Sequence, residues 1–367
     1  MACDYIALAN PGVQKISPYQ PGKPIEELER ELGITDIIKL ASNENPLGCS
    51  PRVLVAIESG MSELALYPDG NGFVLKKALS DFYQRPIEEI TLGNGSNDIL
   101  ELTARAFLGA GDEAIYAQHS FAVYPLVVQA VGATGITVPA RNWGHDLVAM
   151  AAAITPKTRV IFIANPNNPT GTWVEKDELD TFFRAVPENV LVVLDEAYGE
   201  FVEAADFPDG LDYLSRYPNI IVSRTFSKAY GLAALRVGYA FAHPDVTNVL
   251  NRVRQPFNVN ALGLRAAVAA LGDQSFVARV RTLNTDGMRQ ISEGVVALGL
   301  DFIPSRGNFL CIDLKRPGLP VYEALLRQGV IVRPVTSYGL PDFLRVTIGT
   351  RAENERFLAA LKAVLSS

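Results

Sequence analysis

The sequence predicts an α/β protein with a large domain built on a mostly parallel sheet and a smaller α/β domain at the C-terminus. Between residues 36 and 242, short β-rich runs alternate with helical patterns, which indicates repeated βαβ units. After residue 244 the pattern changes to long helical segments followed by further strands. The length of 367 residues also suits two domains. We expect an N-terminal arm, a large domain and a small domain at residues 1–35, 36–250 and 251–367.

The chain begins with an expected extended arm, because it contains four prolines before residue 25, and proline fixes φ and lacks a backbone N–H. Strands are then expected in eight short apolar runs: residues 37–41, 89–93, 113–117, 135–140, 159–164, 189–195, 219–224 and 236–242. Runs of this kind are typical of strands buried on both faces, as in a parallel sheet covered by helices. In the small domain we expect helices at 261–271, 275–298 and 352–365, and strands at 309–314, 330–335 and 343–349.

Composition and charge favour a folded protein that binds small molecules. The chain is 48% apolar and 20% charged, and its net charge of -7 gives no reason to expect a nucleic-acid or membrane surface. The cysteines and histidines are scattered, without metal-ligand spacing: Cys3, Cys49, Cys311, His119, His145 and His243. We therefore expect no metal site and no disulfide framework. With no signal peptide and no apolar run long enough to span a bilayer, we predict a cytoplasmic protein.

The most informative segment is residues 223–239, SRTFSKAYGLAALRVGY, in which a strand enters a hydroxyl-rich loop. Thr225 and Ser227 can donate hydrogen bonds to a phosphate, and Arg236 can add a fixed positive charge. Lys228 can form an imine with an aldehyde that this phosphate holds in place. A single loop lysine is more often a solvated charge, so the neighbouring residues carry the hypothesis.

This segment resembles the cofactor-lysine motif of the fold-type I aminotransferases, S-x-S-K with an arginine further on, except that Thr225 replaces the first serine. The resemblance covers nearly the whole chain. It implies a large domain with a mostly parallel seven-stranded sheet, a smaller C-terminal α/β domain, a homodimer, and pyridoxal 5'-phosphate attached to Lys228. It also implies that Arg236 contacts the cofactor phosphate.

The sequence GNGSN, at residues 93–97, lies between a predicted strand and a predicted helix. Free backbone N–H groups at a helix N-terminus suit a phosphate. An ordinary glycine turn is the alternative, and a dinucleotide-binding loop is disfavoured because the third glycine of that fingerprint is missing. By the resemblance, Gly95, Ser96 and Asn97 hold the cofactor phosphate.

Two further motifs follow buried strands. NPNNPTG, at residues 165–171, is a turn when taken alone, and the resemblance assigns Asn168 a hydrogen bond to the phenolic oxygen of the pyridoxal ring. VLVVLDEAY places Asp195 at the end of an apolar strand, where a carboxylate needs a partner such as a protonated pyridine nitrogen. A helix cap or a structural ion pair is the alternative for Asp195. The family also places Tyr198 against the phenolic oxygen.

Three more assignments come from the resemblance. Phe121 occupies the position of the aromatic residue that stacks on the cofactor ring, although a core phenylalanine is the plain alternative. Tyr67 matches a tyrosine that reaches the cofactor phosphate of the neighbouring subunit; without the resemblance it is a surface residue beside a turn. Arg345, in FLRVTIG, matches the arginine that binds the substrate carboxylate, and the alternative is a structural arginine.

Segments at residues 17–24, 40–48 and 330–335 resemble one group in this family, the histidinol-phosphate aminotransferases. In that group Tyr19 and Arg333 help to hold the substrate phosphate, and Asn45 lies near the substrate. The implied reaction exchanges an amino group between histidinol phosphate and 2-oxoglutarate, with glutamate as the other amino acid, in histidine biosynthesis. Its catalytic residues are Lys228, Asp195 and Tyr198. Aromatic transamination is the main alternative. Decarboxylation and a non-catalytic regulatory role on the same fold are others.

Overall fold

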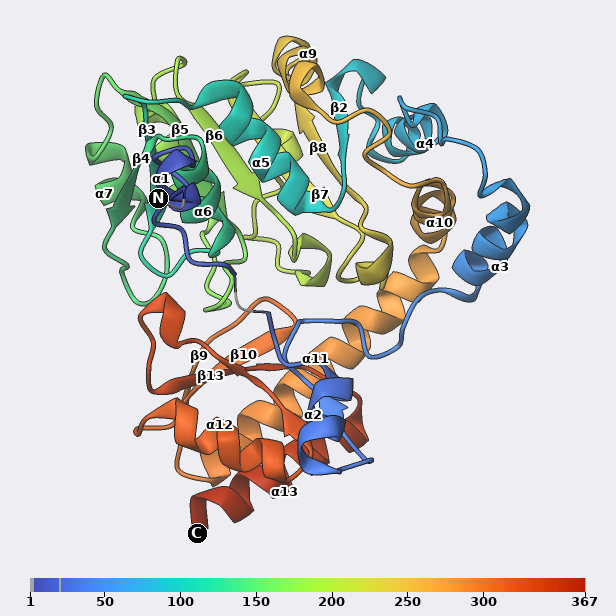
Figure 1. The fold of residues 1–367 in the computed structure, drawn as a ribbon, viewed down its shortest axis with the longest axis vertical. Coiled ribbons are helices and arrows are strands. Elements are labelled where there is room, and N and C mark those ends of the chain that lie inside the picture. Colours follow the sequence, from blue (N-terminus) through green and yellow to red (C-terminus); the bar gives the residue numbers. More distant parts are fainter. Residues whose placement is uncertain (1–2, 20, 367) are drawn as a thin grey trace.

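The computed structural model describes residues 3–19 and 21–366, so that Gln20, within the segment at residues 17–24, lies outside the described part. The described chain forms a large and a small unit, and α11 (Gln274–Ala297) runs between them (Figure 1). No helix in residues 3–19 and 21–366 combines the length and the apolar character needed to cross a membrane.

The large unit is built on a seven-stranded sheet of order β2-β8-β7-β6-β5-β3-β4. Its strands are β2 (Ile90–Gly93), β3 (Glu113–Ala117), β4 (Thr134–Val138), β5 (Thr158–Ala164), β6 (Leu191–Asp195), β7 (Ile220–Thr225) and β8 (Gly238–Ala242). β8 pairs antiparallel with both of its neighbours, and the remaining pairs are parallel. The mostly parallel sheet predicted from the sequence is therefore confirmed.

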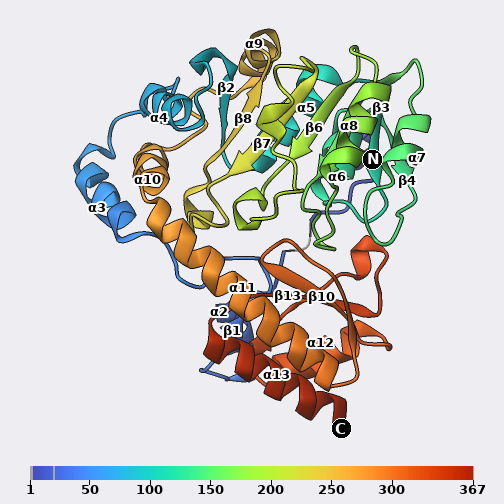
Figure 2. The same ribbon diagram turned by 180° about the vertical axis from the view of Figure 1, so that it is seen from behind.

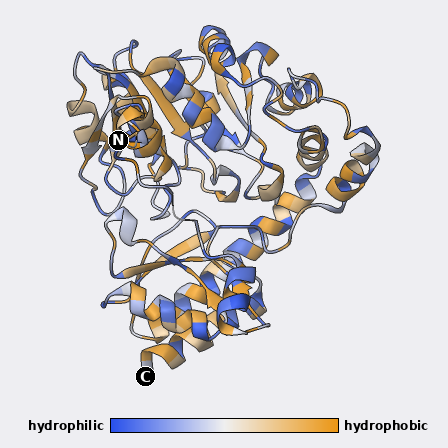
Figure 3. Cartoon of the chain, viewed as in Figure 1, coloured by the Kyte–Doolittle hydropathy of each residue, from blue (hydrophilic) through white to orange (hydrophobic). Residues whose placement is uncertain are grey.

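The sheet is buried on both faces, which explains the continuous apolar runs. In β5, Val160 and Phe162 pack into one core and Ile161 and Ile163 into another. The first core includes α5 (Ser96–Phe107), α6 (Val123–Ala130) and α9 (Pro244–Val253); the second includes α4 (Phe73–Tyr83), α7 (Leu147–Ala152), α8 (Lys176–Ala185) and α10 (Ala261–Leu271). Figure 2 shows this sheet from the opposite side, and the apolar colouring of its strands is visible in Figure 3.

The small unit contains an antiparallel sheet of order β12-β13-β10-β9. Its strands are β9 (Asp301–Ile303), β10 (Phe309–Asp313), β12 (Arg333–Pro334) and β13 (Phe343–Thr347), and its core is completed by α11, α12 (Gly318–Arg327) and α13 (Arg351–Ser366). The helices expected at residues 261–271, 275–298 and 352–365 are confirmed to within one residue at each end.

The N-terminal segment differs from the extended arm that the prolines predict. It contains α1 (Tyr5–Leu8) and α2 (Ile25–Leu32). α2 forms because the last proline of the arm, Pro24, lies at the N-cap, and because the following residues bury Leu28 completely before Gly33 ends the helix with a φ of 67°.

The run at residues 37–41 also differs from its prediction. It forms β1 (Ile38–Lys39), which pairs in parallel with β11 (Val330–Ile331) and not with the large sheet. The next residue, Leu40, packs in the core of the small unit, so burial there decides the pairing. Conversely, α10 packs against α3 (Pro51–Gly60) and α4 of the large unit. The domain limits given above stay a prediction.

Candidate active site

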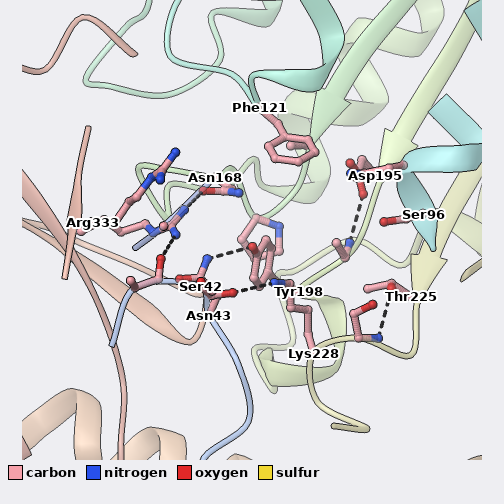
Figure 4. A pocket seen from close by; sticks show the side chains of 18 of the residues that line it. Ser42, Asn43, Ser96, Phe121, Asn168, Asp195, Tyr198, Thr225, Lys228 and Arg333 are labelled. Carbon is pink, nitrogen blue, oxygen red and sulfur yellow. Dashed lines mark hydrogen bonds between the residues drawn. The ribbon is translucent and has the colours of Figure 1, made fainter. Parts of the chain in front are cut away.

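A cavity lies where the large unit meets the small unit (Figure 4). Its walls come from the carboxyl ends of β5, β6 and β7, the first turn of α5, the strands β12 and β13, and residues 41–43. Ligand sites at the carboxyl ends of the strands are typical of open α/β sheets. Most of the predicted site residues line this cavity: Tyr19, Ser96, Asn97, Phe121, Asn168, Asp195, Tyr198, Thr225, Ser227, Lys228, Arg236, Arg333 and Arg345.

Lys228 enters the cavity from the loop that follows β7. Its ammonium group, Nζ, donates a hydrogen bond to the backbone oxygen of Ser42 at 3.1 Å and lies 5.6 Å from the centre of the Tyr198 ring. Burial, assisted by the nearby positive charge of Arg345, lowers the pKa of Lys228 to about 7. A neutral amine is therefore accessible near neutral pH, and this amine can act as a nucleophile or as a base.

Asp195 ends β6 and is 5% exposed. Burial raises the pKa of its carboxyl group to about 6, although two hydrogen bonds oppose this shift. One of these bonds comes from the Tyr124 hydroxyl to Oδ2 at 2.9 Å, and the other comes from the backbone N–H of Ala197 to Oδ1 at 3.3 Å. A cationic ligand group beside Asp195 favours the carboxylate further. Phe121 also lines this part of the cavity, and its ring meets that of Tyr124 edge to face.

Tyr198 and Asn168 are held by residues that the sequence places far away. The Tyr198 hydroxyl accepts a hydrogen bond from Asn43 Nδ2 at 2.9 Å. Burial raises the pKa of Tyr198 to about 12, so its hydroxyl stays protonated at neutral pH. The Asn168 side-chain oxygen accepts a hydrogen bond from Arg345 Nη1 at 2.5 Å. These contacts join the large unit to the small unit across the cavity.

An anion cradle forms at the start of α5. The N-cap residue of this helix is Gly95, with a φ of 80°, and a Cβ at that position would lie 2.2 Å from Arg236 Nη2. Glycine is therefore required for the close approach of Arg236, which also donates a hydrogen bond to Ser227 Oγ at 3.2 Å. The free N–H groups of the first helical turn, together with Ser96 and Arg236, provide positive potential and donors for a phosphate, whereas the Thr225 hydroxyl donates to the backbone oxygen of Val237 at 3.4 Å.

Arg333 and Arg345 form a second cationic wall. They are directly paired on the neighbouring strands β12 and β13, which places both side chains on one face of the small sheet. Arg345 Nη2 donates to the backbone oxygen of Ala41 at 2.7 Å, whereas its buried Nε has no hydrogen-bond partner among the described residues. Arg333 lies over the Tyr19 ring, 5.6 Å from its centre. In Figure 4, Arg333 lies on the opposite side of the cavity from Ser96 and Thr225.

The model of the family described as aminotransferase class I and II matches residues 35–361 of this chain. The chain belongs to this family. It is 61% identical over 368 residues to histidinol-phosphate aminotransferase 2 of Pseudomonas fluorescens (strain Pf0-1), with all of both chains covered. It is 62% identical over 365 residues to the protein of the same name from Pseudomonas aeruginosa, with 99% of each chain covered. The resemblance drawn from the sequence motifs is thus confirmed.

The fold of this aminotransferase is likewise similar to that of a relative with a known structure. The crystal structure of histidinol-phosphate aminotransferase from Sinorhizobium meliloti, in complex with pyridoxal-5'-phosphate, superposes with a TM-score of 0.90. The two sequences are 29% identical, and 97% of each chain is covered. The predicted fold class, a seven-stranded mostly parallel sheet with a smaller C-terminal domain, is confirmed by this likeness and by the topology of the aminotransferase itself.

Three predicted site residues of the aminotransferase do not line the cavity. Gly95 lies directly behind it and makes room for Arg236. Asn45 donates a hydrogen bond to the backbone oxygen of Ala229, so it holds the residue next to Lys228 and makes no wall of the cavity. Tyr67 is 82% exposed and stacks on Phe257, with the ring centres 4.7 Å apart. The contact expected for Tyr67, with the cofactor phosphate of a neighbouring subunit, stays a prediction because it involves a second chain.

Three residues around the site are not among those expected from the sequence. Ser42 and Asn43 line the cavity and bind Lys228 and Tyr198, although only their neighbour Asn45 was assigned within residues 40–48. Asn43 also has a φ of 55°, which a sequence pattern gives no reason to expect. The third residue, Tyr124, follows Phe121 by three positions, the spacing at which two residues share one face of a helical turn.

Proposed function

We propose that this chain is a pyridoxal-phosphate-dependent aminotransferase that exchanges an amino group between histidinol phosphate and 2-oxoglutarate in histidine biosynthesis. The observation that carries this proposal is the pair Arg333 and Arg345, directly opposite each other and facing the cavity that holds Lys228. One substrate carries a phosphate and the other two carboxylates, so the site needs more than one cation. The relatives named above support the choice of substrate.

The cavity fits pyridoxal phosphate in charge and in donors. The cradle at Gly95, closed to any Cβ by Arg236, suits the phosphate group. The buried carboxyl of Asp195 suits a protonated ring nitrogen, and the hydroxyl of Tyr198 suits the phenolic oxygen. When bound, the cofactor supplies an electron-withdrawing ring that stabilises negative charge at the substrate Cα. The proposed cofactor-binding residues are Tyr67, Gly95, Ser96, Asn97, Phe121, Asn168, Asp195, Tyr198, Thr225, Ser227, Lys228 and Arg236.

Lys228 has two roles in this proposal. Lys228 would hold the cofactor through its aldehyde group, and its neutral Nζ would take the proton from the substrate Cα. Burial, which lowers its pKa to about 7, keeps the neutral form available for both roles. Asp195 keeps the ring nitrogen protonated, and Tyr198 and Asn168 hold the ring in one orientation.

Each of the two arginines is assigned to one kind of anionic group on the substrates. Arg345 lines the cavity and is 6% exposed, and its planar guanidinium suits bidentate binding of a carboxylate. Arg333, which lies over the Tyr19 ring and lines the cavity, suits the phosphate of histidinol phosphate. Asn45 acts on the substrate through the backbone beside Lys228.

We further propose a cytoplasmic homodimer in which Tyr67 reaches the cofactor phosphate of the partner subunit. Tyr67 borders an apolar groove between α3, α4 and α10, and neighbouring side chains such as Leu66 are 69% exposed. Exposed apolar side chains gathered in one groove favour a protein interface. A second copy that covers this groove also gives Tyr67 a function that its own chain does not offer.

The substrate assignment is tested by measuring amino transfer to 2-oxoglutarate. Histidinol phosphate, phenylalanine and tyrosine are compared as amino donors under the same conditions. We expect the highest specificity constant with histidinol phosphate. A higher specificity constant with phenylalanine or tyrosine would assign the enzyme to aromatic transamination instead. No transfer from any of the three would contradict the proposal.

A further inference from the structure

Tyr124 lies behind the cavity and contacts the carboxylate on which the cofactor ring depends. It is fully buried in α6, and its hydroxyl donates a hydrogen bond of 2.9 Å to Oδ2 of Asp195. Its ring stacks on Phe162 at 4.9 Å with an interplanar angle of 13°, and meets Phe121 edge to face at 5.9 Å. These two rings fix the direction of the hydroxyl. Tyr124 is not among the residues that line the cavity.

We propose that Tyr124 is a positioning residue that acts through Asp195 and keeps the cofactor ring nitrogen protonated. The inference rests on the proposed cofactor and deepens its assignment to this cavity. Asp195 and the ring nitrogen share one proton, which can lie on either of them. Either the nitrogen holds it beside a carboxylate, or the carboxyl group holds it beside a neutral nitrogen. A hydroxyl that donates to Asp195 stabilises the carboxylate and thus the protonated ring.

Three groups around Asp195 favour its charged form, and the Tyr124 hydroxyl contributes most. Burial raises the pKa of Asp195, and the hydrogen bond from Tyr124 opposes that rise more strongly than the hydrogen bond from Ala197 or the charge of Lys228. Tyr198 also interacts with Asp195 across the cavity. Burial and the charge of Asp195 hold the pKa of Tyr124 well above its usual value, so Tyr124 remains a donor throughout the neutral range. A proton is therefore always present on the oxygen that faces Oδ2.

The experiment compares the wild-type protein with Tyr124→Phe after both are loaded with pyridoxal phosphate labelled with ¹⁵N in the ring. The nitrogen chemical shift reports directly whether the ring nitrogen carries a proton. We expect the wild-type signal in the protonated range and the variant signal displaced toward the neutral range. The kcat should fall roughly tenfold to a hundredfold, as for other lost hydrogen bonds to a charged group, while KM changes by less than about threefold.

The matched control is Tyr239→Phe, which also removes one buried hydroxyl, here bonded to Tyr83 at 2.8 Å. It should leave the nitrogen shift unchanged. If Tyr124→Phe fails to fold, 4-aminophenylalanine at position 124 keeps the size and a weaker N–H donor, and it should give a smaller change of the same sign. A wild-type nitrogen shift in a Tyr124 variant overturns the inference even if kcat falls. Failure of the wild-type protein to bind the cofactor overturns the proposed function itself.

Discussion

Replacement of Arg333 by glutamine tests the substrate assignment most directly. Arg333 is half-buried, lines the cavity and lies over the ring of Tyr19. If its guanidinium binds the substrate phosphate, its loss removes a charge-assisted contact, which typically contributes about 1.5 to 3 kcal/mol. The specificity constant for histidinol phosphate should therefore fall roughly tenfold to a hundredfold. Phenylalanine has no phosphate, so its specificity constant should change little.

Single-turnover spectra with each amino donor measure this difference, because they separate the two half-reactions. The half-reaction with glutamate depends chiefly on Arg345 and should be nearly unaffected by Arg333→Gln. The control is Arg327→Gln, which removes an exposed arginine of α12 outside the cavity and should change none of the rates. Equal losses with histidinol phosphate and phenylalanine in the Arg333 variant would refute the phosphate assignment and favour the aromatic alternative.

Arg345→Gln is a less selective variant, for a reason visible in the structure. Arg345 donates to the side chain of Asn168 and to the backbone oxygen of Ala41. Its loss therefore leaves two acceptors without their donor, and it disturbs a residue expected to contact the cofactor. We expect both half-reactions to slow in this variant. Only the comparison with Arg333→Gln separates the effect of lost phosphate binding from the effect of lost carboxylate binding.

Three further predictions concern the cofactor and the dimer. Asp195→Asn should give a folded protein that binds the cofactor but transaminates roughly two orders of magnitude more slowly, about 3 kcal/mol, and turnover near the wild-type rate would make Asp195 structural. Because burial lowers the pKa of Lys228 to about 7, the neutral amine of the cofactor-free protein gains population as pH rises through that value. Cofactor attachment, followed by visible absorbance and fixed by borohydride, should rise with the same midpoint and vanish in Lys228→Ala; a midpoint near the 10.5 of an ordinary lysine would contradict this. Mixing Tyr67→Ala with Lys228→Ala should restore activity in hybrid dimers, up to about a quarter of the wild-type sites, since one site of each hybrid contains both native residues. No recovery after proven subunit exchange would count against a shared site.

The sequence predicted the sheet and the residues at its strand ends because local patterns specify both. An apolar run such as residues 159–164 can only be buried, and the polar residues that follow it must then emerge at the edge of the sheet. Asp195, Asn168 and Lys228 each follow such a run, so their meeting at one edge follows from parallel topology. Arg345 and Arg333 required the family resemblance, since their pairing depends on the register of β12 and β13.

The N-terminal segment was predicted less well because its structure depends on distant partners. β1 exists through its pairing with β11, almost 300 residues further along the chain, and Asn43 takes a φ of 55° where it contacts Tyr198 and Thr347. The periodicity of apolar residues along the sequence contains no information about such distant contacts. Tertiary packing similarly decides the structure of residues 25–32, where the buried side chain of Leu28 stabilises a helix that the nearby prolines obscure.

These distant contacts also explain why the cavity needs both units. Lys228, Tyr198 and Asn168 follow strands of the large sheet, yet their hydrogen-bond partners come from other segments: Ser42 and Asn43 follow β1, and Arg345 lies on β13. Three separate hydrogen bonds therefore link residues that follow the large sheet to the segment after β1 and to β13. The segment that carries Ser42 and Asn43 is fixed to the small unit, because β1 pairs with β11 and Leu40 packs in the core of that unit. Of the three, only the bond between Arg345 and Asn168 joins a proposed substrate-binding arginine directly to a residue expected at the cofactor ring.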